Sequence, residues 1–541
     1  MKIAKISLSL AMLLVLVGNS GCDKFLDINR DPINPTDVDI SLLMPASQAA
    51  MSTGLGHSIL GLSQPAAAVM QQLTNFRVGS YGLDGNSFNN QWLTLYTNML
   101  SNNELVIRKA TATGAWAYVG IAQIQKAYVF SQMVDVWGDI PYSEALRGAD
   151  GDASIRAPKF DKDSEIYSDL FRLIDEGITN LKRTDGTRAP SSEDLIYAGS
   201  ATKWIRLGNT LKLKLYNQIR LTRDVTGDVT PLLAANADLI TAADDFEFRY
   251  GTAAGNPESR HPGYQGDYAG SSRENNIGPY FYNIMKSTND PRIPYYFFNQ
   301  AATAPNAALY DYVDGRFVSV RFGSVGPQQA ANTTAVRTLQ GLYPIGGRFD
   351  NGSGITTSGG ATGASALGNV PQRFITFFAR RFIEAELQLT VLNNTAAART
   401  ALEAALNASF AKVNAIAGAT TGQLTGSAAA TPILAPAIPA TAIATYVTAA
   451  LARFDAAAGT SGKLNVIMTE KYIANFGTGV DVYTDYRRTD FPVLIPAGTD
   501  PQTVATGAFP VRFPYRVNDL LTNPNAPQQP DVTTAKIFWD R

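Results

Sequence analysis

The sequence predicts a mainly α-helical protein with a long loop-rich stretch in its middle. Apolar side chains recur with the period of an α-helix in segments before residue 222 and again after residue 370. Between these regions, residues 246–368 are dense in Gly, Asn, Ser and Tyr and show little helical periodicity. No 34-residue self-similarity matches a helical-repeat consensus, so any repeat architecture is degenerate.

Length and charge narrow the class of protein. A chain of 541 residues can bury a large core and needs no disulfides to fold. The 45 Lys and Arg residues balance 46 Asp and Glu residues, so no cationic excess favours nucleic acid. With two histidines and one cysteine, we expect no zinc or iron site and no cofactor, and we interpret His57 and His261 as packing or turn residues.

The N-terminus has the pattern of an export signal. Lys2 and Lys5 precede an apolar run over residues 8–17, which at about ten residues is half the length of a membrane-spanning helix. Small residues stand directly before Cys22, and these suit a lipoprotein signal peptidase. We therefore expect residues 1–21 to be a signal peptide and Cys22 to carry a lipid anchor. A conventional signal peptide beside an unrelated cysteine is the alternative.

Helices are predicted throughout the first part of the chain. They cover residues 42–51, 66–73, 92–109, 115–136, 165–181 and 202–221. The fourth is apolar over so much of its surface that we expect it to be buried between neighbours. Asp163 is the predicted N-cap of the fifth. Trp92 and Tyr96 lie one turn apart on the third, and we interpret them as core residues.

The sixth helix carries several cations on its polar side. They are Lys203, Arg206, Lys212, Lys214 and Arg220. Long cationic side chains commonly cover a helix surface while their charges stay in water. We therefore interpret these residues as a solvated face and not as an anion-binding site.

Helices return after the loop-rich stretch. They are predicted over residues 371–392, 395–417, 441–456 and 463–476, with an Ala-, Thr- and Pro-rich surface loop between the middle two. Prolines are scattered through the rest of the chain, which we expect to be irregular. Glu384 and Glu386 could nominally be the carboxylate pair of a hydrolase, but we interpret them as a solvated helix edge.

The standard catalytic spacings are missing from the sequence. It contains no HExxH, no GxSxG after the signal peptide and no complete P-loop. Asp150 and Asp152 resemble the start of a calcium loop, but the remaining oxygen ligands do not follow at the required spacing, so we expect a turn. We therefore predict no catalytic residues and no metal site.

Eight segments, in one order over nearly the whole chain, resemble a known family. They are CDKFLDINRDPINPT from Cys22, WLTLYTNML from Trp92, AQIQKAYVFSQMVDVWGDIPYSEAL from Ala122, PKFDKDSEIYSDL from Pro158, DLIYAGSATKWIRLGNTLKLKLYNQIR from Asp194, NDPRIPYYF from Asn289, EKYIANFGTGVDVYTDYRRTDFPVL from Glu470 and KIFWD near the end. The chain thereby resembles the SusD/RagB-like lipoproteins of the Bacteroidetes outer membrane, in the SusD-like nutrient-binding branch with an LDxNxDPxxPT opening.

The resemblance implies a fold. The expected architecture is mainly α, with degenerate tetratricopeptide-like (TPR-like) helix pairs and a large loop-rich lobe. Residues 22–541 would form a single domain, with an N-terminal helical part at 22–245, the loop-rich lobe at 246–368 and a helical and irregular part at 369–541.

The resemblance also implies a function. The expected protein is not an enzyme; it lies outside the cell on the outer membrane, captures an oligosaccharide or other oligomeric nutrient, and delivers it to a TonB-dependent, SusC-like transporter. A surface polysaccharide hydrolase and an adhesin or structural surface protein are the alternatives. Whether the ligand is a glycan or a peptide stays open.

A glycan-binding surface combines flat aromatic rings with hydrogen-bonding side chains. Sugar rings stack their apolar C–H faces on aromatics while Asn, Asp, Arg and Gln bind the hydroxyls. Two loop stretches have this composition. The candidates are Arg77, Tyr81, Asp84, Asn86 and Phe88 in the first, and Tyr264, Asp267, Tyr268, Arg273, Tyr310, Tyr312 and Arg316 in the second.

Overall fold

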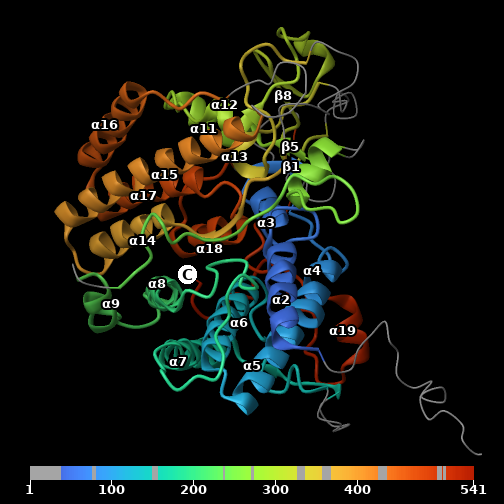
Figure 1. Cartoon of the computed structure of the whole chain (residues 1–541). Coiled ribbons are helices and arrows are strands. Elements are labelled where there is room, and N and C mark those ends of the chain that lie inside the picture. The colour runs from blue at the N-terminus through green and yellow to red at the C-terminus, as the bar shows by residue number, and fades with distance from the viewer. Residues whose placement is uncertain are drawn as a thin grey trace, which may run out of the picture.

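The structure is a computed structural model that describes residues 38–75, 81–148, 156–234, 238–269, 273, 275–325, 336–355, 367–424, 435–495, 503 and 507–540. The predicted signal peptide, Cys22, Arg77 and the residues around Asp150 and Asp152 lie outside these ranges. Helices dominate and the strands are short, which confirms the mainly α prediction (Figure 1). Within these ranges, no helix is both long enough and apolar enough to cross a membrane.

The N-terminal part of the body is a layer of packed helices. Its elements are α2 (Ile40–Leu55), α3 (Ser63–Val69), α4 (Asn89–Leu93), the π-helix η1 (Thr94–Leu100), α5 (Ser101–Thr113), α6 (Trp116–Trp137), α7 (Asp163–Leu181), α8 (Ala201–Ile219) and α9 (Thr226–Leu232). Nearly all of α6 is buried, as its apolar sequence predicts. It lies so close to α7 that a Cβ at Gly120 would be 2.6 Å from the backbone oxygen of Gly177.

The predicted N-cap of α7 is wrong. Asp163 is the first residue of that helix, and Lys162 precedes it without a capping side chain. The Asp163 carboxylate accepts the backbone N–H of Phe538 at 2.9 Å. A contact with the far end of the chain therefore replaces the local cap.

The C-terminal part of the body is also helical, but its first predicted helix begins as a strand. Its elements are β10 (Gln372–Ile375), α14 (Phe377–Thr390), α15 (Thr395–Leu424), α16 (Ala440–Ala456), α17 (Gly459–Ala474), α18 (Gly479–Thr489) and α19 (Val517–Thr522). The helices α18 and α19 lie in the stretch that was expected to be irregular. Residues 372–375 are extended because β10 pairs antiparallel with β4 (Phe246–Phe248).

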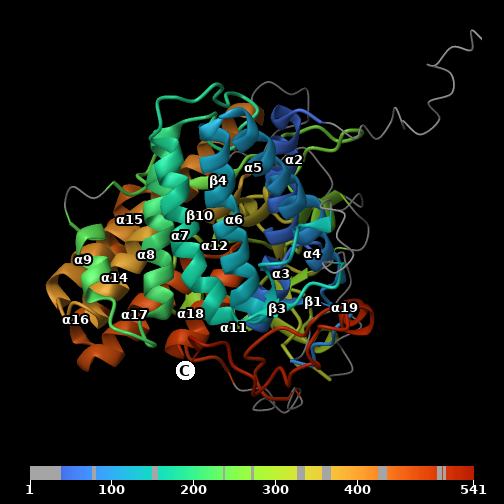
Figure 2. The ribbon, with the colours of Figure 1, turned by 90° about the horizontal axis from the view of Figure 1, so that it is seen from below.

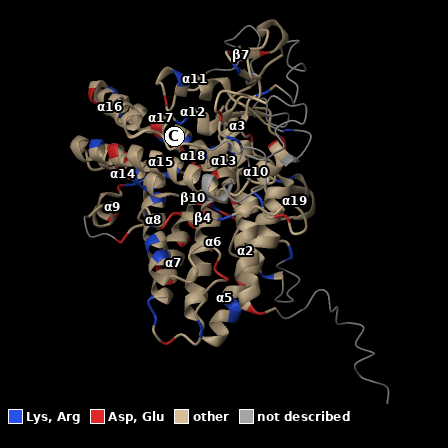
Figure 3. Ribbon diagram, turned by 45° about the horizontal axis from the view of Figure 1, so that its top comes forward, with Lys and Arg blue, Asp and Glu red and all other residues tan. Residues whose placement is uncertain are grey.

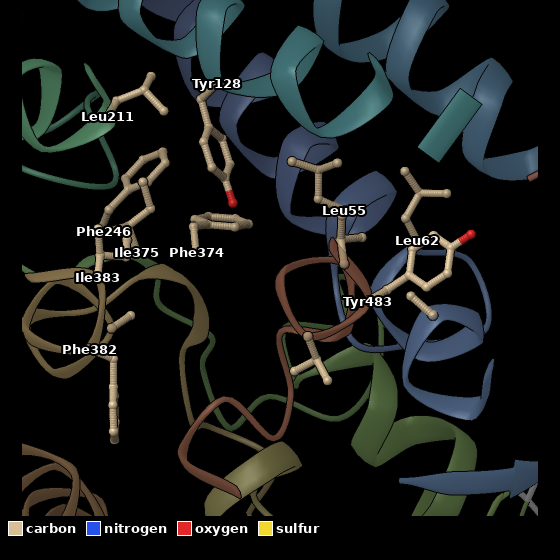
Figure 4. Close-up of a cluster of buried hydrophobic side chains, with 14 of the residues drawn as sticks. Leu55, Leu62, Tyr128, Leu211, Phe246, Phe374, Ile375, Phe382, Ile383 and Tyr483 are labelled. Carbon is tan, nitrogen blue, oxygen red and sulfur yellow. The ribbon is translucent and has the colours of Figure 1, made fainter. Parts of the chain in front are cut away.

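An aromatic cluster joins this strand pair to the helices of the N-terminal part. The Tyr128 ring on α6 lies 5.1 Å from that of Phe246 and 5.8 Å from that of Phe374. Figure 4 shows these side chains converging with Leu211 of α8 and Ile383 of α14. Each of the five side chains is buried, so the two helical parts share one core.

The last described segment closes over the end of α6. The backbone N–H of Phe513 donates to the Val136 carbonyl at 2.6 Å, and Trp137 Nε1 donates to the Pro514 carbonyl at 3.1 Å. Trp539 Nε1 donates to the fully buried Asp135 carboxylate at 3.0 Å. Residues 507–540 are therefore part of the core packing of the N-terminal helices.

The loop-rich lobe consists of short strand pairs and single helical turns, at the upper right of Figure 1. Its strands are β5 (Asn275–Ile277), which pairs with β1 (Leu73–Asn75), β6 (Phe297–Phe298) with β9 (Leu339–Gln340), and β7 (Tyr312–Asp314) with β8 (Phe317–Ser319). Its helical segments are α10 (Pro262–Tyr264), η4 (Gln265–Ala269), α11 (Pro279–Ser287), α12 (Ile293–Tyr296), η5 (Ala307–Leu309) and α13 (Leu342–Ile345). A further pair, β2 (Ile140–Pro141) with β3 (Phe160–Asp161), lies in the body.

Two buried histidines fix the contact between the lobe and the body. His57 Nε2 donates to the Gln340 amide oxygen at 2.6 Å, and His261 Nε2 donates to that of Gln372 at 3.3 Å. Burial lowers the pKa of His57 to about 4 and that of His261 to about 3. Both rings are therefore neutral near pH 7, and the prediction that they are packing residues is confirmed.

A buried ion network lies between the helices of the body. Glu386 is fully buried and accepts from Arg488 at 2.9 and 3.0 Å and from Arg220 at 2.9 Å. Burial by itself would raise the Glu386 pKa, but these cations and Lys471 outweigh it and hold the pKa well below its usual value. Asp485 completes the network through Arg488 and Lys471, at 2.6 and 2.9 Å.

Several charged residues were therefore wrongly predicted to be solvated. Glu384 is 7% exposed and pairs with Arg380 and Arg381, so neither it nor Glu386 is a solvated helix edge. Lys214 and Arg220 are buried in the same way, whereas Lys203, Arg206 and Lys212 do lie at the surface, where each pairs with an aspartate. The burial of Lys214, Arg220 and Glu386 was missed because their partners lie on distant segments, whereas Glu384 pairs within its own helix.

Candidate functional site

The site is built on the hairpin β7–β8 and the neighbouring helix α11. Val313 faces Val318 in the hairpin, and Asp314 faces Phe317. Gly315 begins the two-residue turn with a φ of +59°, a conformation that glycine adopts without strain. This tight turn places Arg316 at the tip and Tyr312 on the flank of the hairpin.

Two tyrosines lie over one buried phenylalanine. The Tyr282 ring, on α11, stacks on the Phe317 ring with a centroid distance of 3.9 Å and an angle of 8°. Tyr312 meets the same ring edge-on at 6.0 Å and 83°. Phe317 is 1% exposed, whereas both tyrosines are half-buried. One face of Tyr282 is thus covered by Phe317, and the Lys286 ammonium lies 5.9 Å from the centroid of the ring.

Hydrogen-bonding side chains surround these rings. The Tyr312 hydroxyl donates to the Asn283 amide oxygen at 3.1 Å, and Lys286 forms an ion pair with Asp314. Arg316 donates to both oxygens of Asp350 at 2.9 and 3.0 Å. We call Tyr282, Asn283, Lys286, Tyr312, Asp314 and Arg316 the aromatic shelf.

The chemistry of the aromatic shelf is suited to a neutral, hydroxyl-rich ligand. Burial and then the Asp314 carboxylate raise the pKa of Tyr282, so its hydroxyl stays protonated near pH 7. Lys286 is paired with Asp314, and Arg316 with Asp350. The Asn283 amide, the Lys286 ammonium and the Arg316 guanidinium carry hydrogen-bond donors beside the tyrosine rings. The shelf can therefore stack a sugar ring and bind its hydroxyls without attracting a strongly charged ligand.

The first predicted loop stretch contributes mostly packing. Phe88 is fully buried and stacks on Phe513 at 4.4 Å, and Tyr81, 8% exposed, packs against Phe322 at 4.8 Å. Neither ring is open to a sugar in this structure. Asp84 and Asn86 are exposed, and the Asp84 carboxylate accepts the Asn86 N–H at 2.7 Å.

The second stretch divides into a buried half and a surface half. Tyr264 and Tyr268 stack on each other at 5.2 Å and are 4% and 1% exposed, and Asp267 accepts from Gln340 at 2.8 Å with no exposure. Arg273 is also buried, and it donates to Gln300. These four side chains hold the base of the lobe together. The half-buried members are Tyr310, Tyr312 and Arg316, and the last two belong to the aromatic shelf.

Tyr282, Asn283 and Lys286 were not among the predicted residues. They lie on α11, a helix that begins at Pro279 inside a stretch read as loops. The segment PYFYN contains the aromatic and amide residues expected of a glycan site, together with proline in the first turn. From the sequence alone, this composition could have identified the segment as part of the candidate site.

Among the described residues, those considered for catalysis or metal binding do not come together as a site. The carboxylates of Glu384 and Glu386 are engaged by buried cations and cannot reach a polysaccharide. In the part of the chain that the structure describes, no group of three or more His, Cys, Asp or Glu side chains could hold a metal ion. The core interpretation of Trp92 and Tyr96 is confirmed: their rings lie 5.0 Å apart, and Trp92 is 3% exposed.

The fold of the chain is that of several solved structures. A SusD/RagB family protein from Bacteroides thetaiotaomicron aligns with a TM-score of 0.70 and 18% identity, over 93% of this chain and 99% of that one. A chitin-binding protein aligns at 0.67 and 18%, over 93% and 100%. An outer-membrane protein from Bacteroides vulgatus, described as involved in nutrient binding, aligns at 0.65 and 19%, over 93% and 100%.

Sequence comparison identifies the family directly. No curated protein is significantly similar to the chain. A family model described as starch-binding and associating with the outer membrane matches residues 32–516, which is most of the chain. The chain therefore belongs to the SusD-like family.

Proposed function

We propose that this chain is a cell-surface lipoprotein that binds an oligosaccharide on the aromatic shelf and delivers it to a TonB-dependent, SusC-like transporter. It acts by binding and not by catalysis. The family's description as starch-binding and outer-membrane-associated supports the ligand class and the location. The observation that carries the proposal is the pair Tyr282 and Tyr312, held over Phe317 with polar side chains around them.

The stacking of Tyr282 on Phe317 gives the shelf its rigidity. A ring that is already fixed in one orientation loses little conformational entropy when a sugar packs on it. Tyr312 is held at its hydroxyl by Asn283, and Arg316 by Asp350. Three of the ligand-facing groups are thus positioned before any ligand arrives.

Calorimetric titration with maltoheptaose and chitohexaose tests the ligand site. We expect Tyr282→Ala and Tyr312→Ala each to weaken binding of the preferred oligosaccharide about tenfold or more, because each removes a stacking surface. Asp84→Ala and Asn86→Ala serve as controls on the other predicted loop and should leave the affinity unchanged. Loss of binding in these controls, with the tyrosine variants unaffected, would move the site to the first loop.

Location and delivery are tested separately. Mass spectrometry of the mature protein should find a lipid on Cys22 and no residue before it. Purification in mild detergent from the native host should recover the chain together with a SusC-like transporter. An unmodified Cys22 contradicts the anchor, and repeated recovery of a free monomer contradicts the delivery function.

A further inference from the structure

Two runs of the sequence, each of which reaches the molecular surface in a helix, contain no charged residue. Asp, Glu, Lys and Arg are absent from Ile40 to Phe76 and again from Gly85 to Asn103. The first run contains α2, and the second contains α4 and η1. Roughly a quarter to a third of an ordinary soluble surface is charged, so two charge-free surface helices side by side need an explanation.

The two helices pack against each other. A Cβ on Gly54 of α2 would lie 2.7 Å from Leu95 and 3.4 Å from Thr94 of η1, so the two helices touch there. Figures 1 and 2 both show α2 beside α4 and α5 on the outside of the body. The exposed residues are Leu42, Ala46 and Ala49 from α2, and Leu93, Thr97 and Asn98 from α4 and η1. We call these six residues the neutral face.

The polar groups of this region are already partnered within their own helices. The Thr97 hydroxyl donates to the Leu93 carbonyl at 2.7 Å, and the Thr53 hydroxyl to that of Ala49 at 3.1 Å. Asn102 donates its amide to the Asn98 carbonyl at 2.7 Å. A partner that covers these side chains therefore leaves few hydrogen-bond donors without an acceptor. Excluding water from the neutral face consequently has a low desolvation cost.

Another outer side of the body has the opposite character. On α7, Arg172 pairs with Asp169 at 2.6 Å and with Glu176 at 2.5 Å, and Lys212 of α8 reaches Asp175 at 2.7 Å. Figure 3 shows charged segments along α7 and α8, whereas α2 is free of them. The absence of charge is therefore a property of one side of the molecule and not of all its helices.

We infer that the neutral face is the surface that docks on the transporter. The inference rests on the proposed function and names the part of the chain that carries out its delivery step. Protein interfaces are depleted of charge at their centres, and Leu42 and Leu93 present large apolar side chains to the solvent here. The position agrees as well: α2 follows directly on Val38, and the 16 residues from Cys22 to Val38 span at most about 55 Å.

The composition favours a protein partner over the lipid surface itself. Peripheral binding to a bilayer uses Lys and Arg beside Trp and Phe. The neutral face has none of these residues and presents Ala, Leu, Thr and Asn instead. Its charge-free surface matches an uncharged patch on another folded protein.

Introducing single lysines tests the inference in the full-length, lipidated chain, co-expressed with the tagged SusC-like transporter that co-purifies with the wild type. Ala49→Lys and Thr97→Lys each place a charge in the interface, and each should lower the amount of chain retained on the transporter at least about tenfold. Ala49→Ser should be retained like the wild type. Ser168→Lys on α7 is the matched control, because Ser168 is exposed and its hydroxyl donates to its own helix at Ser164, as Thr97 does.

Each outcome discriminates between explanations. Unchanged melting temperatures and unchanged oligosaccharide affinity in both lysine variants would confine the effect to docking. Retention of these variants at the wild-type level overturns the inference while leaving the proposed function in place. Failure of the wild type itself to be retained overturns the delivery function. The inference is also overturned if the lysines instead abolish binding to protein-free vesicles or self-association measured by light scattering.

Discussion

The buried ion network of the body and the aromatic shelf of the lobe use their charged side chains in opposite ways. In the body, Glu386, Arg488 and Asp485 are locked in a network between helices and contact no solvent-facing site. In the lobe, Lys286, Asp314 and Arg316 stay near the surface around two half-exposed rings. The charged residues of this network thus hold helices together, whereas those of the aromatic shelf stay accessible from the solvent. Each prediction below tests this contrast.

The largest effect is expected from breaking the network of the body. Glu386→Ala leaves Arg488 and Arg220 buried without their carboxylate, so we expect the free energy of unfolding to fall by about 3–5 kcal/mol. Urea denaturation measures the change. Glu403→Ala is the control, because this glutamate is exposed on α15, and it should change the free energy by less than about 0.5 kcal/mol. A small loss in Glu386→Ala would mean that the network is dispensable.

The junction between body and lobe should respond to pH. The pKa values of His57 and His261, about 4 and about 3, lie below the ordinary 6.5, so the unfolded chain binds more protons in the window between. Stability should therefore fall as the pH drops from 6.5 to 5, by roughly 1.5 kcal/mol per histidine. Denaturation at several pH values above 5 avoids most carboxylate titration. His261→Gln should reduce the slope by about half, and a flat profile in the wild type would refute the assignment.

A smaller cost is expected when the aromatic shelf loses a ring. Tyr282→Ala removes the stack on Phe317 but leaves a site that is already half exposed, so stability should fall by about 1–1.5 kcal/mol. The same variant should lose its oligosaccharide affinity. A loss of stability as large as that of Glu386→Ala would show that the lobe is held together by its surface residues.

The smallest effect is expected at the ion pair of the shelf. Lys286 and Asp314 are 51% and 30% exposed, and exposed pairs contribute about 0–1 kcal/mol. Lys286→Met keeps the aliphatic stem and should change the free energy of unfolding by less than about 0.5 kcal/mol. Thermal and urea denaturation both measure this. A change in the free energy of unfolding several times larger would show that this pair stabilises the fold as strongly as the buried ion pairs of the body.

Sequence reasoning found the helices whose buried side is apolar and missed those whose buried side is polar. The helix α6 was predicted to within a residue because apolar side chains cover most of its surface. By contrast, α18 buries Asp485 and Arg488, so its pattern resembles a loop until Glu386 supplies a partner about a hundred residues away. The strand β10 was missed for a related reason: its partner β4 lies more than a hundred residues earlier.

The candidate site was half predictable. Residues of Gly- and Asn-rich loops were expected to form the site, and two of the predicted residues, Tyr312 and Arg316, lie on the aromatic shelf. Composition does not reveal which ring turns inward, however. Tyr264 and Tyr268 cover each other, and Phe88 meets Phe513, a residue more than four hundred positions away. Packing between segments that are distant in the sequence decides which rings support a loop and which can contact a ligand.

The bond between Trp539 and Asp135 also sets the order in which the chain can fold. The Asp135 carboxylate, which Tyr167 also contacts at 2.5 Å, receives its indole donor only after four hundred further residues have been synthesised. The C-terminal end of α6 therefore cannot complete its packing while the ribosome is still extending the chain. A long interval without a finished core suits the export proposed above, in which the chain crosses a membrane before it folds.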